Sequence, residues 1–125
     1  RLKKDFRYYI KQNGGMLAKG RLLGIQFLTL FEDGLYFELA SHAVNQALRI
    51  RDAFKKKGYA FLAESPSNQQ FPILPNDIMA KLSENYLFSV WQKVDDNHTA
   101  VRFCTSWATK RENVDRLCND IKELL

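Results

Sequence analysis

The sequence predicts a small α+β domain, with helices through its first half and a β-β-α-β-β-α arrangement with a mostly antiparallel sheet in its second half. Three observations lead to this prediction. Apolar residues recur at helical spacing up to about residue 57, and runs rich in Val, Phe, Trp and Thr follow, separated by turn residues. The length of 125 residues, with 46% hydrophobic and 26% charged residues, suits one folded domain.

The first two predicted helices cover residues 3–12 and 16–31, and Asn13-Gly14-Gly15 separates them. The apolar residues of the second helix lie around nearly its whole circumference: Leu17, Leu22, Leu23, Ile25, Phe27, Leu28, Leu30 and Phe31. A domain of this size can rarely enclose such a helix, so we expect another surface to cover it. Gly20 and Gly24 each cost a helix about 1 kcal/mol relative to Ala, which favours close packing of another backbone there.

A longer helix is predicted from residue 35 to residue 57, after a break at Asp33-Gly34. Its apolar positions recur every three or four residues: Tyr36, Leu39, Ala43, Ala47, Ile50 and Phe54. Gly58, directly after three lysines, is typical of a helix end, because glycine adopts left-handed backbone and lysines suit the negative end of the helix dipole. A helix of this length spans about 35 Å, enough to connect two lobes.

The second half alternates between strands and helices. The predicted strands are residues 59–63, 68–74, 87–94 and 99–105, with a helix at 76–86 between the second and third. The final helix is predicted to begin at a capping box, Thr109-Lys110-Arg111-Glu112. Its inner stripe comprises Val114, Leu117, Cys118, Ile121 and Leu125. This order predicts a sheet with helices on one face.

Composition excludes several classes of protein and site. Cys104 and Cys118 are the only cysteines, too few for a disulfide framework, so we expect both to be reduced and partly buried in a cytoplasmic protein. Charged residues interrupt the longest apolar run, so no segment is expected to span a membrane. His42, His98 and the cysteines lack the spacing of a metal site. Since the sequence begins with Arg1 and not Met, we expect that either a longer chain or a processing site precedes it.

Two short patterns allow a chemical and a structural interpretation. Cys104 and His98 could form a nucleophilic pair, but six residues of separation along a hairpin define no such geometry, and we favour a core cysteine. Gly14 and Gly15 could offer N–H groups to a phosphate, although a turn between two helices is favoured on the residues alone.

The basic N-terminal stretch could bind nucleic acid, because Tyr8 and Tyr9 interleave with its charges. Its basic residues are Arg1, Lys3, Lys4, Arg7, Lys11, Lys19 and Arg21. A solvated helix face is favoured, because no nucleic-acid motif matches and the net charge is only +5. A free-standing interaction or nucleic-acid-binding module is nevertheless kept as the alternative function.

Arg102 lies in an otherwise apolar predicted strand. Alternation places it on the same face as Ala100 and Cys104, opposite Val101 and Phe103. If it pointed inward, its desolvation would require an anionic partner such as a carboxylate. On the residues alone, an arginine on the solvent face is favoured.

Four segments together resemble the C-terminal part of the low-specificity threonine aldolase family, a β-eliminating lyase group of pyridoxal-phosphate (PLP) enzymes with the aspartate aminotransferase fold (fold type I). The segments are Asn13-Gly14-Gly15-Met16, the run to Glu32-Asp33-Gly34-Leu35-Tyr36, Asn68-Gln69-Gln70-Phe71-Pro72-Ile73-Leu74, and Val101-Arg102-Phe103-Cys104-Thr105-Ser106-Trp107-Ala108-Thr109. The resemblance covers essentially the whole chain. It implies that residues 1–125 form the C-terminal small domain of such an enzyme, joined by the helices of about residues 3–57 to a large domain that the chain lacks.

The resemblance also implies the parent's activity. Such enzymes bind PLP as a Schiff base to a lysine and cleave a β-hydroxy amino acid, threonine yielding glycine and acetaldehyde. In this family the cofactor lysine, the aspartate and the ring-stacking histidine lie upstream, so the chain is expected to contain no catalytic residue and to be inactive alone. Lys19 and Lys93 do not lie in the family's lysine motif. The intact enzyme is expected to be a cytoplasmic homo-oligomer acting on a small amino acid, with no membrane or nucleic-acid partner.

Two sites follow from the resemblance. Arg102 matches the family's arginine that grips the substrate α-carboxylate. Gly14 and Gly15 match a Gly-Gly-Gly-Met-Arg-Gln motif near the cofactor phosphate. Either Lys19 or Arg21 could supply the charge of the missing arginine, and Lys19 is assigned to the site with the two glycines. The motif here departs from the family pattern, since Asn13, Leu17 and Ala18 replace its first glycine, its arginine and its glutamine. Lyases that act on other amino acids are therefore kept as an alternative to a threonine aldolase.

Overall fold

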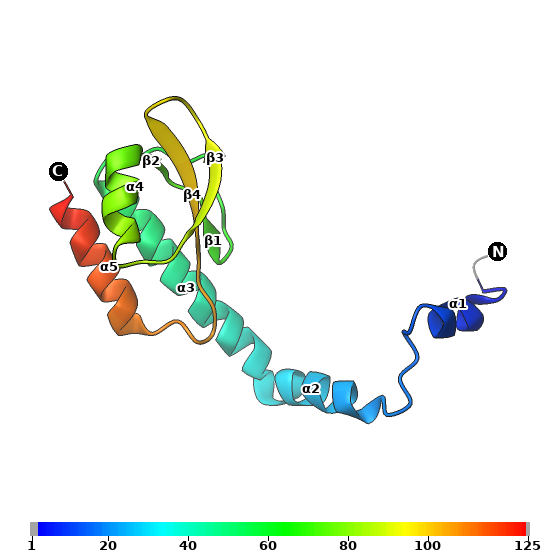
Figure 1. Ribbon diagram of the computed structural model, residues 1–125. Helices are drawn as coiled ribbons and strands as arrows, with labels where there is room; N and C mark the ends of the chain where they lie inside the picture. The colour runs from blue at the N-terminus through cyan, green and yellow to red at the C-terminus, as the bar shows by residue number, and fades with distance from the viewer. Residues whose placement is uncertain (1–2, 125) are drawn as a thin grey trace. The chain divides into compact units, whose positions relative to one another are not determined.

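The computed structural model describes residues 3–124, and the chain divides into two compact units between Tyr36 and Phe37. The regular elements of the first unit are all helical, and the second packs three helices against a small antiparallel sheet (Figure 1). The predicted α+β class is confirmed, and so is the predicted order of elements from the strand at 68–74 to the last helix.

The first unit consists of α1 (Phe6–Gln12), α2 (Arg21–Phe31) and a 3-10 turn, η1 (Glu32–Gly34). The predicted second helix begins five residues later than expected, because residues 16–20 form turns and Gly20 becomes the residue that precedes the helix. α2 buries none of its residues among those described, and a Cβ added at Gly20 or Gly24 would meet no atom within 4 Å. The surface that we expect to cover this helix is therefore not supplied by the first unit itself.

The long helix α3 (Leu35–Lys56) matches its predicted bounds within one residue. Its end is a Schellman motif: Gly58, at φ 85°, donates its N–H to the Lys55 carbonyl at 2.9 Å, and Tyr59 donates to the Phe54 carbonyl at 3.2 Å. The Tyr59 ring then packs edge-on against Phe54, with ring centroids 5.7 Å apart. The predicted helix end at Gly58 is thus confirmed, and the same turn begins the core.

The sheet is built around one central strand, β4 (His98–Cys104), and all of its pairings are antiparallel. On one side of β4 lie β1 (Gln69–Gln70) and β2 (Ile73–Pro75), and on the other lies β3 (Ser89–Lys93). β1 and β2 keep a single register against β4, so they are the two ends of the one strand predicted at 68–74. Pro72 interrupts it, because proline has no N–H to donate; its carbonyl still accepts from Val101 at 3.0 Å.

The strand predicted at residues 59–63 is wrong. Only one isolated bridge forms, between Phe61 and Pro72, with Leu62 donating to the Phe71 carbonyl at 2.9 Å. Beyond this bridge the amide of Gln70 donates to the carbonyls of Ser65 and Ser67 at 3.1 and 3.0 Å. Side-chain hydrogen bonds to a turn therefore replace the backbone ladder that a longer strand would need.

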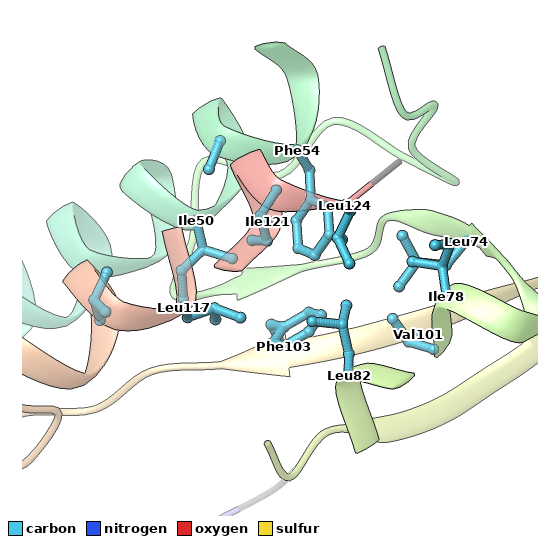
Figure 2. Close-up of a cluster of buried hydrophobic side chains, with 12 residues drawn as sticks. Ile50, Phe54, Leu74, Ile78, Leu82, Val101, Phe103, Leu117, Ile121 and Leu124 are labelled. Atoms are coloured by element: carbon cyan, nitrogen blue, oxygen red, sulfur yellow. The ribbon is translucent and has the colours of Figure 1, made fainter. Parts of the chain in front are cut away.

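Three helices supply the core against one face of the sheet: α3, α4 (Asn76–Ser83) and α5 (Arg111–Glu123) (Figure 2). The buried cluster comprises Ile50, Ala53, Phe54, Leu74, Ile78, Leu82, Val101, Phe103, Val114, Leu117, Ile121 and Leu124. Val101 and Phe103 are the core-facing residues of β4, as alternation predicted. Leu125, predicted for the inner stripe of the last helix, lies outside the described residues.

The predicted capping box at the start of α5 is wrong. Lys110, and not Thr109, is the residue that precedes the helix, and no side chain caps its N–H groups. The Thr109 hydroxyl instead accepts a hydrogen bond from the Ser106 N–H at 2.9 Å, and the Thr109 carbonyl lies 2.8 Å from Nε2 of His42 on α3. The threonine therefore shapes the loop between β4 and α5, which lies against α3.

Candidate functional site

Arg102 lies on β4, on the sheet face opposite the helices. Its neighbours in sequence, Val101 and Phe103, are buried in the core at 0% and 5% exposure, and Cys104 is exposed. Arg102 itself is half-buried. The predicted alternation is confirmed, and the arginine faces away from the helical core.

A β-bulge brings Trp91 to this face. Ser89 and Val90 of β3 pair with Arg102 and Val101, whereas Gln92 pairs with Ala100, so Trp91 is an extra residue with no direct partner on β4. Trp91 has not been singled out by sequence reasoning. The only sequence signal is a tryptophan in a predicted strand, which does not reveal a bulge.

The guanidinium of Arg102 packs against the Trp91 ring, with Cζ 5.1 Å from the ring centroid. Nη2 of Arg102 donates to the Ser89 hydroxyl at 3.4 Å, a long and weak contact. Nε of Arg102 is buried and has no hydrogen-bond partner among the described residues. Within residues 3–124 no carboxylate forms an ion pair with Arg102, so its charge is compensated only by the ring.

A shallow hollow adjoins this arginine. It is lined by Leu87, Phe88, Ser89, Arg102 and Cys104. A guanidinium presents five N–H donors in a fixed plane, which suits the two oxygens of a carboxylate. Chemically, the hollow therefore offers one unpaired cation beside apolar side chains, an arrangement that fits a small carboxylate-bearing molecule.

Cys104 is not the core cysteine that we predicted. It is exposed, because it lies on the outer face of β4, whereas Cys118 is half-buried as expected; both are free thiols. His98 is six residues away at the other end of β4, about 20 Å along an extended strand. The two residues thus lie too far apart to act as a nucleophilic pair.

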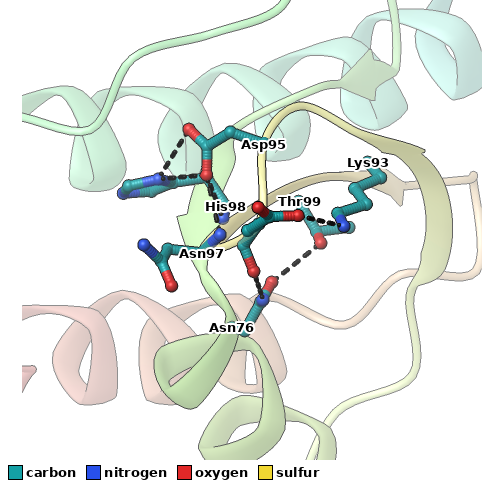
Figure 3. A network of polar contacts seen from close by, with 7 residues as sticks. Asn76, Lys93, Asp95, Asn97, His98 and Thr99 are labelled. Atoms are coloured by element: carbon teal, nitrogen blue, oxygen red, sulfur yellow. Dashed lines mark hydrogen bonds and ion pairs between the residues drawn. The ribbon is translucent and has the colours of Figure 1, made fainter.

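His98 belongs instead to a polar network at the β3–β4 loop (Figure 3). Nδ1 of His98 lies 3.0 Å from the Asp95 carboxylate, which also accepts from the N–H groups of Asn97 and His98 at 2.8 Å each. These bonds, led by the one from Asn97, lower the pKa of Asp95 below its usual value. Asn76 ties the loop to α4 by donating to the Asp96 carbonyl at 3.0 Å. These contacts stabilise the loop of the β3–β4 hairpin, and they indicate no catalytic or binding role.

Gly14 and Gly15 form the C-terminal cap of α1. Gly14, at φ 71°, donates to the Lys11 carbonyl at 3.1 Å, and Gly15 donates to the Ile10 carbonyl at 2.8 Å. Both N–H groups are therefore used, and in this arrangement they offer no free donor to a phosphate. Lys19 is exposed in the turn before α2. The cofactor role of these residues stays a prediction, and they do not by themselves make a phosphate site.

The remaining candidate features carry no site. Within residues 3–124 no three His, Cys, Asp or Glu side chains group as metal ligands would. No described helix is long and apolar enough to cross a membrane. The basic residues of the N-terminal stretch are exposed from Lys3 onward, and Arg1 lies outside the described part of the chain.

Comparison with known proteins relates this chain to one enzyme family. No family profile matches the sequence. The low specificity L-threonine aldolase of Pseudomonas sp. (strain NCIMB 10558) is 28% identical over the whole of this chain, which spans 36% of that protein. The solved structure of threonine aldolase from Leishmania major is 38% identical, superposes with a TM-score of 0.89 and matches 94% of this chain, but only 34% of its own. The predicted relationship is confirmed: this chain is a relative of the threonine aldolases that spans about a third of their length.

Proposed function

We propose that this chain is the C-terminal domain of a PLP-dependent lyase that cleaves a β-hydroxy amino acid, and that Arg102 binds the substrate's α-carboxylate. One observation carries the assignment of Arg102: a half-buried cation beside a hollow, without any carboxylate partner among the described residues. A buried or half-buried charge is stable only when it is compensated, so an external anion fits this position. The relationship with the threonine aldolases supports an amino acid as that anion.

In this proposal the chain does no bond-breaking by itself. PLP, held covalently by a lysine outside this chain, would supply an electron sink for the reaction of the amino acid. Arg102 orients the substrate by holding its carboxylate at two oxygens, which fixes the direction of the Cα bonds. The chain alone is accordingly expected to be inactive.

The same proposal gives α2 a partner. Its apolar side chains are exposed, for example Leu22 at 68%, Phe27 at 62% and Leu28 at 64%. An exposed apolar surface of this kind is unusual for a soluble protein unless something covers it. We assign that cover to the large domain of the enzyme or to a second subunit of a homo-oligomer.

Replacing Arg102 tests the assignment. In the protein expressed from its complete gene, Arg102→Ala is expected to lower kcat/KM for L-threonine by about 10- to 1000-fold, since it removes a charge-assisted pair worth about 1.5–3 kcal/mol or more. Arg51→Ala is a matched control, because Arg51 forms its ion pair with Asp52 on the surface of α3. Aldehyde release and the visible absorbance of the cofactor are measured for both variants.

The outcomes separate the two parts of the proposal. A yellow protein that releases acetaldehyde and loses this activity in Arg102→Ala supports both the reaction and the role of Arg102. A yellow protein that does not react with threonine would support a PLP enzyme but refute the aldolase activity. Wild-type kinetics in Arg102→Ala would show that Arg102 does not bind the substrate. A protein that stays colourless even with added PLP would refute the assignment as a PLP enzyme.

A further inference from the structure

We propose that Trp91 is a positioning residue for Arg102: its ring, lifted over the sheet by the bulge in β3, sets the plane of the guanidinium that receives the carboxylate. This inference rests on the proposed function of Arg102. Trp91 is not proposed to contact the reacting atoms.

The bulge makes this placement possible. In a regular ladder, residue 91 would face Ala100 of β4, but the register shifts by one between Val90 and Gln92. A bulge bends its strand and redirects the side chain at that point. Trp91 is thereby released from the pairing and reaches across β4.

The second contact of Trp91 shows how far its ring reaches. Its centroid lies 5.2 Å from that of Phe71 in an edge-on arrangement. Phe71 follows Gln70, which pairs with β4 from the side opposite β3. Strands two apart in a sheet are separated by about 9.6 Å, so the two rings can approach this closely only by leaning over β4. Ala100, which pairs with Ile73 on one side and with Gln92 on the other, is completely buried although it faces away from the helices.

Arg102 packs against one of these two rings, that of Trp91. Its Cζ is 5.1 Å from the Trp91 centroid, whereas its one hydrogen bond within the described residues, to Ser89, is 3.4 Å long. Stacking is therefore the stronger constraint on the guanidinium plane. The buried, unpartnered Nε is consistent with an arginine held by the ring and not by hydrogen bonds. A fixed plane lowers the entropy that a bidentate carboxylate contact must otherwise lose.

A double-mutant cycle in the complete protein tests this. Trp91→Ala is expected to raise the dissociation constant for glycine, read from the cofactor spectrum, by about 3- to 30-fold, the range of a cation–π contact. Trp91→Phe keeps a ring and is expected to restore binding to within about 3-fold. In the Arg102→Ala background, Trp91→Ala is expected to have no further effect, because the group that it orients is gone.

A second readout is independent of turnover. In protein labelled with fluorotryptophan, the fluorine signal that disappears in Trp91→Phe belongs to Trp91, and adding glycine is expected to shift it. Trp107 is the control, since it is 69% exposed and no ring contact to it is described. Equal losses from Trp91→Ala with and without Arg102 would overturn the inference and show a merely structural role. If Arg102→Ala binds glycine as tightly as the unchanged protein does, the proposed role of Arg102 is refuted. If Arg102→Ala weakens glycine binding but Trp91→Ala does not, only the inference about Trp91 is refuted.

Discussion

Removing the ring of Phe54 is expected to destabilise the second unit strongly. Phe54 is completely buried at the end of α3, where its ring contacts Tyr59 at 5.7 Å and Phe103 at 5.4 Å between centroids. It thereby joins the long helix, the turn at Gly58 and the central strand. Phe54→Ala removes the side chain from the middle of all three contacts.

The size of the effect follows from this burial. Truncating a fully buried phenylalanine to alanine costs about 3–5 kcal/mol, of which the two ring pairs contribute about 0.5–1.5 kcal/mol each. Domains are stable by only about 5–15 kcal/mol, so the variant is expected to be marginally folded. Phe54→Leu fills most of the space and is expected to cost about 1–2 kcal/mol, which keeps the measurement possible if the alanine variant does not fold.

Urea denaturation followed by far-UV circular dichroism measures these costs. Phe27→Ala is the matched control, because Phe27 is 62% exposed on α2, and it is expected to change the free energy of unfolding by less than about 0.5 kcal/mol. A Phe54→Ala variant that loses no more stability than Phe27→Ala would refute the packing described for the core.

Two further predictions concern titratable groups. The pKa of Asp95 is lowered, first by the N–H of Asn97 and then by His98, so its stabilising effect is present above the unfolded pKa of about 4 and is lost as the pH falls through the folded pKa. Asp95→Ala should therefore lower the Tm at about pH 7 but not at about pH 2, and an equal loss at both would contradict this. Burial raises the pKa of Cys118, whereas Cys104 is exposed, so a thiol reagent should modify Cys104 much faster. Cys104→Ser should remove the fast phase, and its persistence would show that the two thiols are misassigned.

Local patterns account for the parts of the fold that sequence reasoning predicted well. The bounds of α3 follow from helical spacing and from Lys-Gly at its end, because a helix and its cap depend on residues within one or two turns. The face of Arg102 follows from alternation, which holds for any strand whatever its neighbours. Its role as a candidate site came from the resemblance to the aldolases, since a single arginine in a strand carries no such signal.

Some of the errors concern partners that are distant in the chain. Pro72 divides a strand because of the hydrogen bond that it fails to make with β4, and Thr109 gives up its capping role to shape a loop. Cys104 is exposed because of the face on which it lies at the end of β4, not because of its type. The division at Pro72 and the contact of the Thr109 carbonyl with His42 depend on groups that meet across space, whereas the exposure of Cys104 follows from the same alternation that places Arg102.

By itself, the sequence determined the α+β class, the order of the elements from residue 68 onward and the face of β4 that carries Arg102, since each depends on spacing along the chain. Only the tertiary structure decided that a bulge releases Trp91, that the ring packs on Arg102 and meets Phe71 across β4, and that Gly14 and Gly15 use their N–H groups within α1. The physical reason is that register and hydrogen-bond satisfaction are settled jointly by strands and turns far apart in the chain.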